Sequence, residues 1–172
     1  MPGRWRRKGV MHEMAIPPPP DDEAIYRRYA DDLVRYATVL VGPTDAPDVV
    51  ADAVLRAMRS RGWPAVDNRR AYLYRAVYNQ AVSLHRSGAR RRRREQVVAL
   101  REPRPVPAAS DGQLDAHQAL AQLSEQQRAV VFLTYWEDLT PAQIANLLQV
   151  AEGTVRKQLA RGRDRLRRIL DV

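Results

Sequence analysis

Arginine is the residue of this sequence with the most obvious chemical use, and it is concentrated in two places. The chain has 172 residues, with 29 Lys and Arg against 20 Asp and Glu. One basic zone comprises Arg86 and Arg90–Arg94, and the other lies at residues 156–168. The planar guanidinium donates paired hydrogen bonds to phosphates and guanine edges. Two such zones predict two contacts with one long polyanion: nucleic acid is the first candidate, and an anionic membrane surface the second.

Other kinds of chemistry find little support in the sequence. There is no cysteine, and His12, His85 and His117 lie far apart, so we expect neither a metal site nor a cofactor. The acidic pairs at 21–22 and 31–32 cannot flank one substrate, because adjacent residues point in different directions on a helix. Without a phosphate loop or a nucleophile–base set, no catalytic residue and no enzyme are predicted. No apolar run suits a membrane span or secretory signal, so we expect a cytoplasmic protein without membrane insertion.

The C-terminal basic zone follows a short helix with clear boundary signals. Residues 124–127 and 140–143 are both capping boxes, the second with proline at the first helical position. A turn of about four residues then leads to a basic helix expected to begin at Thr154, which predicts a helix-turn-helix. The side chains that would reach bases or phosphates are Glu152, Thr154, Arg156, Lys157, Gln158 and Arg161. The alternative is a helical hairpin with a solvated basic face.

Apolar residues repeat at helical spacing through the rest of the chain, so an all-α protein is predicted. The first expected helix carries Ile25 to Leu40 and ends at Gly42-Pro43, and a second surrounds Val50 to Met58. A third should begin at an N-cap on Asp67. The buried positions expected on this third helix are Leu73, Val77, Ala81 and Leu84.

Alternating prolines divide the chain into two small helical domains. The stretch from Pro103 to Gly112 cannot form a helix and predicts an extended linker. The expected organisation is a disordered extension (1–20), a helical bundle (21–94), a flexible linker (95–114) and the helix-turn-helix unit (115–172). Met11 and Met14 are alternative starts to Met1.

Both helical units resemble one known family. Residues 119–140, 144–148 and 152–163 look like region 4 of the extracytoplasmic-function (ECF) sigma factors of RNA polymerase. Residues 48–58 and 71–79 are similar to region 2 of the same family. The two motifs occur in the same order as in the family. With Gln158 in its recognition helix, the sequence resembles an actinobacterial branch of the family. Region 4 here departs from the family at Ala151, where serine usually caps the helix, and at Gln149, which replaces a common turn glycine.

The resemblance implies a non-catalytic specificity subunit. It would bind core RNA polymerase through the β′ coiled coil and the β flap, recognise the −35 and −10 promoter elements and help to open the duplex. An anti-sigma factor is a further candidate partner. The residues that match the polymerase-binding helix are Asp48, Asp52, Leu55, Arg56 and Arg59. The residues assigned to the −10 element and to melting are Arg61, Trp63, Arg69, Arg70, Tyr72, Arg75, Asn79 and Arg86. The recognition-helix residues would read the −35 element.

Several alternatives stay open at this point. Aromatic rings interleaved with arginines can stack on single-stranded bases, but some of Tyr72, Tyr74 and Tyr78 could equally be core residues. A local hydrogen bond is about as plausible for Asn79 as a base contact. An autonomous helix-turn-helix regulator that binds duplex DNA as a dimer remains the alternative function.

Overall fold

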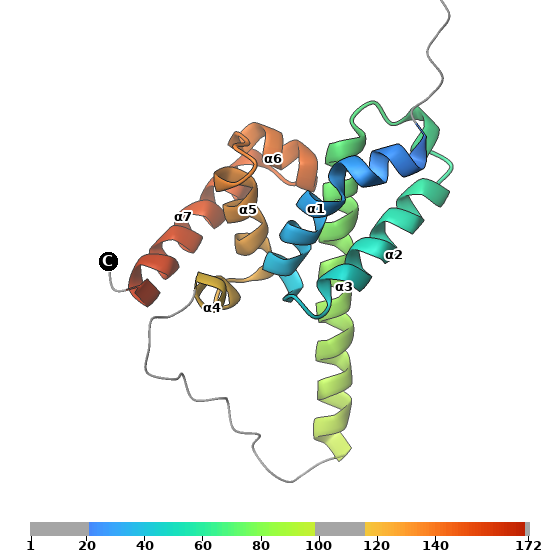
Figure 1. Ribbon diagram of the computed structural model, residues 1–172. Helices are drawn as coiled ribbons and strands as arrows, with labels where there is room; N and C mark the ends of the chain where they lie inside the picture. Colours follow the sequence, from blue (N-terminus) through green and yellow to red (C-terminus); the bar gives the residue numbers. More distant parts are fainter. Residues whose placement is uncertain (1–20, 99–115, 171–172) are drawn as a thin grey trace, which may run out of the picture.

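The computed structural model describes residues 21–98 and 116–170, and all its regular elements in these ranges are helical (Figure 1). The all-α prediction is therefore confirmed. None of the helices in the described ranges has the length and apolar character needed to cross a lipid bilayer. The N-terminal extension and the proline-rich linker lie outside the described residues.

The first unit is a bundle of three helices, α1 (Asp22–Val41), α2 (Ala46–Arg59) and α3 (Arg69–Val98). A short 3-10 turn, η1 (Trp63–Ala65), stands between α2 and α3. The expected apolar stripes face inward, and Leu33, Leu40 and Leu73 are completely buried. Gly42 ends α1 with a positive φ of 90°, and its N–H donates to the Thr38 carbonyl, which explains why glycine stands there.

Three details of α3 differ from the prediction. The helix is capped by Asn68 rather than Asp67, because the Asn68 side chain accepts a hydrogen bond from the Ala71 N–H at 2.9 Å. Leu84 is 39% exposed instead of buried, since beyond Ala81 the helix projects past its neighbours (Figure 1). The helix also continues to Val98, beyond the expected end of the bundle at residue 94.

The second unit contains α4 (Ala116–Ala121), α5 (Glu125–Tyr135), α6 (Pro141–Leu148) and α7 (Glu152–Leu170). Both predicted capping boxes are confirmed, with reciprocal hydrogen bonds between Ser124 and Gln127 and between Thr140 and Gln143. Gln149, which replaces a common turn glycine, adopts the left-handed conformation, with φ 57° and ψ 47°. A non-glycine residue there carries a modest strain, which the tight turn between α6 and α7 requires.

The basic helix α7 lies against α5 and α6 along a narrow stripe. It begins at Glu152, slightly before the predicted start at Thr154. Val155 is fully buried, and an added methyl group at Gly162 would lie 3.2 Å from Val131 Cγ2, so glycine allows α7 to approach α5 closely. The buried stripe does not reach the end of the helix, because Leu170 is 45% exposed.

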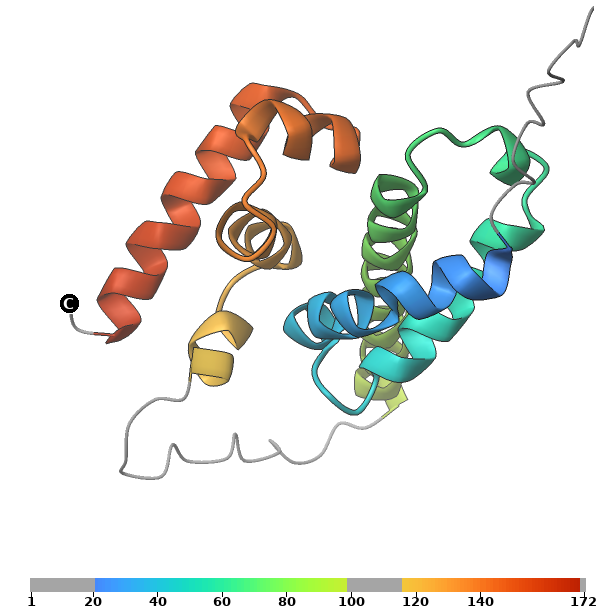
Figure 2. The ribbon, with the colours of Figure 1, turned by 45° about the horizontal axis from the view of Figure 1, so that its top comes forward.

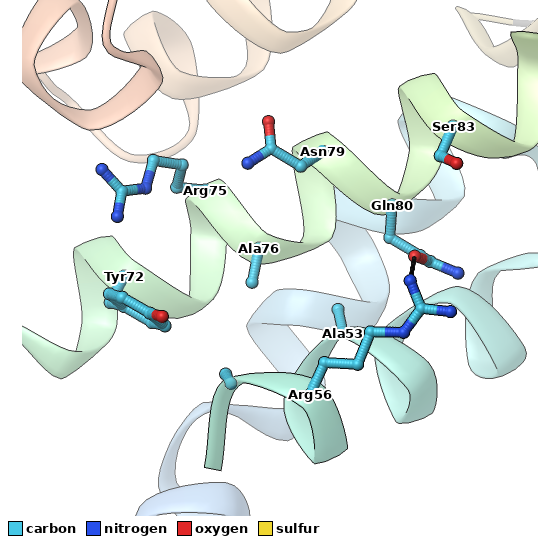
Figure 3. Close-up of a pocket in the computed structure, with 9 residues that line it drawn as sticks. Ala53, Arg56, Tyr72, Arg75, Ala76, Asn79, Gln80 and Ser83 are labelled. Atoms are coloured by element: carbon cyan, nitrogen blue, oxygen red, sulfur yellow. Dashed lines mark hydrogen bonds between the residues drawn. The ribbon is translucent and has the colours of Figure 1, made fainter. Parts of the chain in front are cut away.

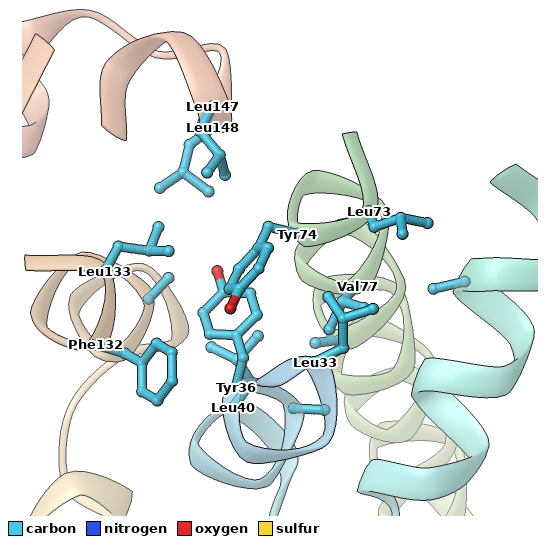
Figure 4. Close-up of a cluster of buried hydrophobic side chains, with 14 of the residues drawn as sticks. Leu33, Tyr36, Leu40, Leu73, Tyr74, Val77, Phe132, Leu133, Leu147 and Leu148 are labelled. Carbon is cyan, nitrogen blue, oxygen red and sulfur yellow. The ribbon is translucent and has the colours of Figure 1, made fainter. Parts of the chain in front are cut away.

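The two units pack against each other, as Figure 2 shows from a second direction. One continuous buried cluster runs through both of them. Figure 4 shows its centre, where Tyr36 of α1 lies between Tyr74 of α3 and Phe132 of α5, with ring centroids 5.1 and 5.2 Å away. The second unit therefore uses the first as a packing partner.

Candidate nucleic-acid interface

A groove between α2 and α3 brings together three residues that the sequence assigned to the −10 element, Tyr72, Arg75 and Asn79, with Arg56 of the predicted polymerase-binding set (Figure 3). Its volume is about 270 Å³. The alanines Ala53, Ala57 and Ala76 keep the two helices close, and longer polar side chains surround them. These polar lining residues are Arg56, Tyr72, Arg75, Asn79, Gln80 and Ser83.

Asn79 stands on the outer side of α3 with its amide open to solvent (Figure 3). Within the described part of the chain this amide forms no hydrogen bond, so its donor and acceptor stay available. The sequence left a local hydrogen bond open, and the structure contains none. Nearby, Arg75 lies over the Tyr72 ring at 5.3 Å, which combines a cation with a half-buried aromatic face.

Trp63 corrects the sequence interpretation. It was expected to offer a face to an unstacked base, yet it is only 3% exposed. Its indole Nε1 donates to Asp22 Oδ1 at 2.7 Å, and Arg69 covers the ring at 5.2 Å from its centroid. The edge of Tyr72 packs against it as well. In this conformation Trp63 fixes the loop before α3 to the start of α1 and has no free face for stacking.

Arg70 is held by the second unit. Its guanidinium forms an ion pair with Glu137, which lies in the turn between α5 and α6, and it also lies over the Tyr74 ring. Tyr74 is 2% exposed, so this tyrosine is a core residue. Burial is the largest single influence on the pKa of Arg70 and lowers it, but Glu137, Tyr74 and Asp32 together outweigh burial, and the net shift is upward. Burial and the hydrogen bond to Glu137 raise the pKa of Tyr74.

The remaining arginines of this set are not gathered in the groove. Arg61 is exposed in the loop after α2, and Arg86 is exposed one turn beyond Ser83 on α3. The helical backbone continues through residues 90–94, but their side chains lie outside the described set.

The predicted polymerase-binding residues share the outer surface of α2. Asp48, Asp52, Arg56 and Arg59 are exposed, and Leu55 places an apolar side chain among them that is 50% exposed. These positions are compatible with docking, which stays a prediction.

Gln80, which no motif in the sequence singled out, joins this surface to α3. Its amide oxygen accepts from Arg56 Nη1 at 2.9 Å, and its nitrogen donates to Asp52 Oδ2 at 3.2 Å. The only signal in the sequence was its position next to Asn79.

The recognition helix α7 exposes its basic side chains to solvent. Arg156, Lys157 and Arg161 are exposed, whereas Thr154 and Gln158 are half-buried. Glu152 accepts from Arg156 Nε at 3.0 Å and so fixes the direction of the guanidinium within the first turns of the helix. A preoriented arginine loses less conformational freedom when it binds.

Comparison with known proteins matches each unit separately. Residues 25–92 match the family model of Sigma-70 region 2, and residues 113–166 match that of Sigma-70, region 4. The ECF RNA polymerase sigma factor SigL of Mycobacterium tuberculosis is 36% identical over 152 residues, which cover 79% of this chain and 81% of SigL. The chain belongs to the ECF sigma factors.

Further relatives place this sigma factor among actinobacterial proteins. The RNA polymerase sigma-E factor of Streptomyces coelicolor is 31% identical over 153 residues, covering 84% of this chain and 83% of that protein. Among solved structures, the sigma factor RpoE of Bartonella quintana, in complex with NepR, superposes with a TM-score of 0.68 at 24% identity over 87% of this chain and 96% of that one. This last likeness supports the fold.

Membership establishes the function in general terms. As an RNA polymerase sigma factor, the protein binds core polymerase and directs initiation at promoter DNA. The groove belongs to region 2, and α7 belongs to region 4.

Proposed function

We propose that this sigma factor acts by binding alone, without catalysing a reaction, and that it uses three separate surfaces. The outer surface of α2 docks on the polymerase, the α2–α3 groove reads the opened −10 element, and α7 reads the −35 element. The observation that carries the proposal is the solvent-exposed Asn79 amide on the outer side of α3, which forms no hydrogen bond within the described part of the chain. One groove wall would then contact polymerase and the other DNA.

At the −10 element, Asn79 would form hydrogen bonds with the edge of an unstacked base. Bases in single strands are bound by polar edge contacts and by aromatic or guanidinium faces, and Tyr72 with Arg75 supplies such a pair. Arg61, Arg69 and Arg86 would contact backbone phosphates. Trp63 acts indirectly in this proposal, because it holds the loop that carries Arg61.

At the −35 element, α7 would enter the major groove by its first turns. Arg156 is the residue with the geometry for a paired contact to guanine, while Lys157 and Arg161 would contact phosphates. Glu152, Thr154 and Gln158 complete the reading surface. The buried Val155 fixes which side of the helix faces the DNA.

We also propose that an anti-sigma factor regulates the protein. The support is the arrangement of the two units, which superposes on a Bartonella sigma factor solved together with its anti-sigma factor. Copurification from the native host with a tagged chain, followed by displacement of the captured protein by core polymerase, would test this.

The alternative is an autonomous regulator that binds duplex DNA without polymerase. Such a protein would not require the exposed α2 surface or an open asparagine on α3. In vitro transcription from a genomic promoter library, using core polymerase with and without the protein, separates the two functions. New initiation sites that share −35 and −10 sequences are expected, and a complete lack of added initiation would refute the proposal.

A further inference from the structure

One acidic side chain at the contact between the two units, Glu137, meets two donors of the first unit. Glu137 Oε2 pairs with Arg70, and its Oε1 accepts from the Tyr74 hydroxyl at 2.7 Å. The Glu137 side chain is 9% exposed, whereas that of Arg70 is 43% exposed. Both carboxylate oxygens are therefore occupied by donors from α3, and these donors belong to the helix proposed to hold promoter DNA.

The arrangement resembles an anion site with its anion already in place. A guanidinium and a neighbouring hydroxyl are donors suited to a carboxylate or to a phosphate oxygen. While Glu137 is bound, the charge of Arg70 is matched within the chain, and a DNA phosphate would have to displace the carboxylate. The same carboxylate can therefore tie the units together and keep nucleic acid away from Arg70.

A second polar contact joins the two units on the other side of the Tyr36, Tyr74 and Phe132 rings. Arg128 Nη1 donates to the Leu40 carbonyl at 2.6 Å, so a cation of α5 meets the C-terminal end of α1. This contact uses a backbone carbonyl and no residue assigned to DNA. Separation of the two units would break both contacts. Of the two, only the Glu137 contact involves a residue that is a candidate for DNA binding.

Two features of the interface favour its opening. The Tyr36 hydroxyl is buried and has no hydrogen-bond partner in the part of the chain that the structure describes. A buried polar group without a partner destabilises the packed state, and separation would return it to water. In addition, a cavity of about 70 Å³ lined by Arg70, Tyr74, Glu137 and Leu147 lies between the units, so packing around the ion pair is incomplete.

We propose that Glu137 is an autoinhibitory latch: it holds region 4 on region 2 and occupies Arg70 until promoter DNA competes for it. This inference rests on the proposed role of α3 in binding promoter DNA. It adds a closed, DNA-excluding state of the free protein to that function. Release exchanges one anion for another at Arg70 and frees the Tyr36 hydroxyl.

The latch can be measured directly because the chain has no cysteine. Spin labels introduced through Thr44→Cys, in the loop after α1, and Ala142→Cys, on α6, would report the separation of the units in the full-length protein. Both positions are exposed. Glu137→Gln should increase the ratio of separated to packed molecules by about tenfold, as expected for loss of a charge-assisted contact.

Asp138→Asn is the matched control, since it makes the same change in net charge at the next residue and keeps a side chain that tolerates the positive φ of 53°. It should leave the distance distribution unchanged. The exchanged pair Arg70→Glu with Glu137→Arg should restore the packed distances. Equal distributions for Glu137→Gln and Asp138→Asn would overturn the latch.

The DNA arm uses a mixed-sequence single-stranded oligonucleotide and the same full-length variants. Glu137→Gln should bind several-fold more tightly than Asp138→Asn, and the gain should vanish in an Arg70→Gln background. An equal gain for both neutralised acids would reflect net charge alone and would refute DNA exclusion. The distances report the latch even if library transcription fails, so failure of the latch and failure of the proposed function can be told apart.

Discussion

The two helices proposed to contact DNA, α3 and α7, present their arginines in opposite ways. On α7, Lys157 and Arg161 extend into solvent, and among the described residues Arg156 is paired only with one of its own helix. On α3, Arg70 is paired with an acid from the other unit and Arg75 lies over an aromatic ring. The proposed −35 surface is therefore ready to bind, whereas Arg70 on α3 must first exchange its partner.

The difference follows from how each helix is packed. α7 touches its unit along one narrow stripe that includes Val155 and Gly162, so most of its circumference is free. α3 lies between α1, α2 and α6, so its arginines stand beside the side chains of neighbouring helices. Substitutions on α7 should therefore affect either its packing against α5 and α6 or a single exposed side chain. Substitutions on α3 should affect the side chains of the helices that surround it.

The largest effect on stability is expected where α7 packs against α5. Gly162→Leu should lower the free energy of unfolding by about 3 kcal/mol, because even a methyl group would lie 3.2 Å from Val131 Cγ2. Urea denaturation followed by circular dichroism measures it. Gly153→Ala, with open space around the added methyl group, should be neutral or raise stability by up to about 1 kcal/mol. Equal losses for both variants would show that close approach at Gly162 is unimportant.

Loss of the Arg156 side chain should change sequence preference rather than stability. Arg156→Ala should relax discrimination at one −35 position by about 1 to 3 kcal/mol, since a paired arginine–guanine contact would be lost. Binding titrations against duplexes with each −35 base substituted would measure this. Lys157→Ala should weaken all duplexes alike and reduce the salt slope by about 1. Unchanged −35 binding in both variants would show that α7 is not the reader.

Local features of this fold could be predicted from sequence, because a few neighbouring residues determine them. The capping boxes at Ser124 and Thr140 depend only on short-range backbone geometry, and both were predicted correctly. The exposed basic face of α7 also followed from helical periodicity. Together these features were sufficient to predict the helix-turn-helix.

Contacts between distant segments could not be predicted in the same way. An apolar stripe shows that Tyr36 and Phe132 are buried, but not that they are buried against each other. Trp63 among arginines suggested base stacking, yet its environment depends on Asp22, 41 positions earlier in the chain. Likewise, nothing local marks Glu137 as the partner of Arg70. The sequence therefore located the residues of the candidate site but not the side chains that contact them.

On α3, Asn79→Ala should weaken initiation by about three- to tenfold, the value of one neutral hydrogen bond. Binding to core polymerase should be unchanged, because Asn79 contributes nothing to the α2 surface. Runoff transcription measures the loss, and templates already melted with an unrelated −10 sequence should remove the difference between variant and wild type. A parallel loss of core binding would assign Asn79 a structural role.

The smallest effect should come from one hydroxyl at the centre of the interface, and its sign is diagnostic. Tyr36→Phe removes a buried hydroxyl that has no partner among the described residues, so the free energy of unfolding should rise by about 1 kcal/mol. The melting temperature should increase by roughly 2 to 4 °C. Tyr74→Phe makes the same chemical change in a ring 5.1 Å away, but it removes the hydrogen bond to Glu137. It should lower the free energy of unfolding by a similar amount and favour separation of the units. Calorimetry of the two variants compares them directly, and shifts of the same sign would contradict this account of how α3 is held.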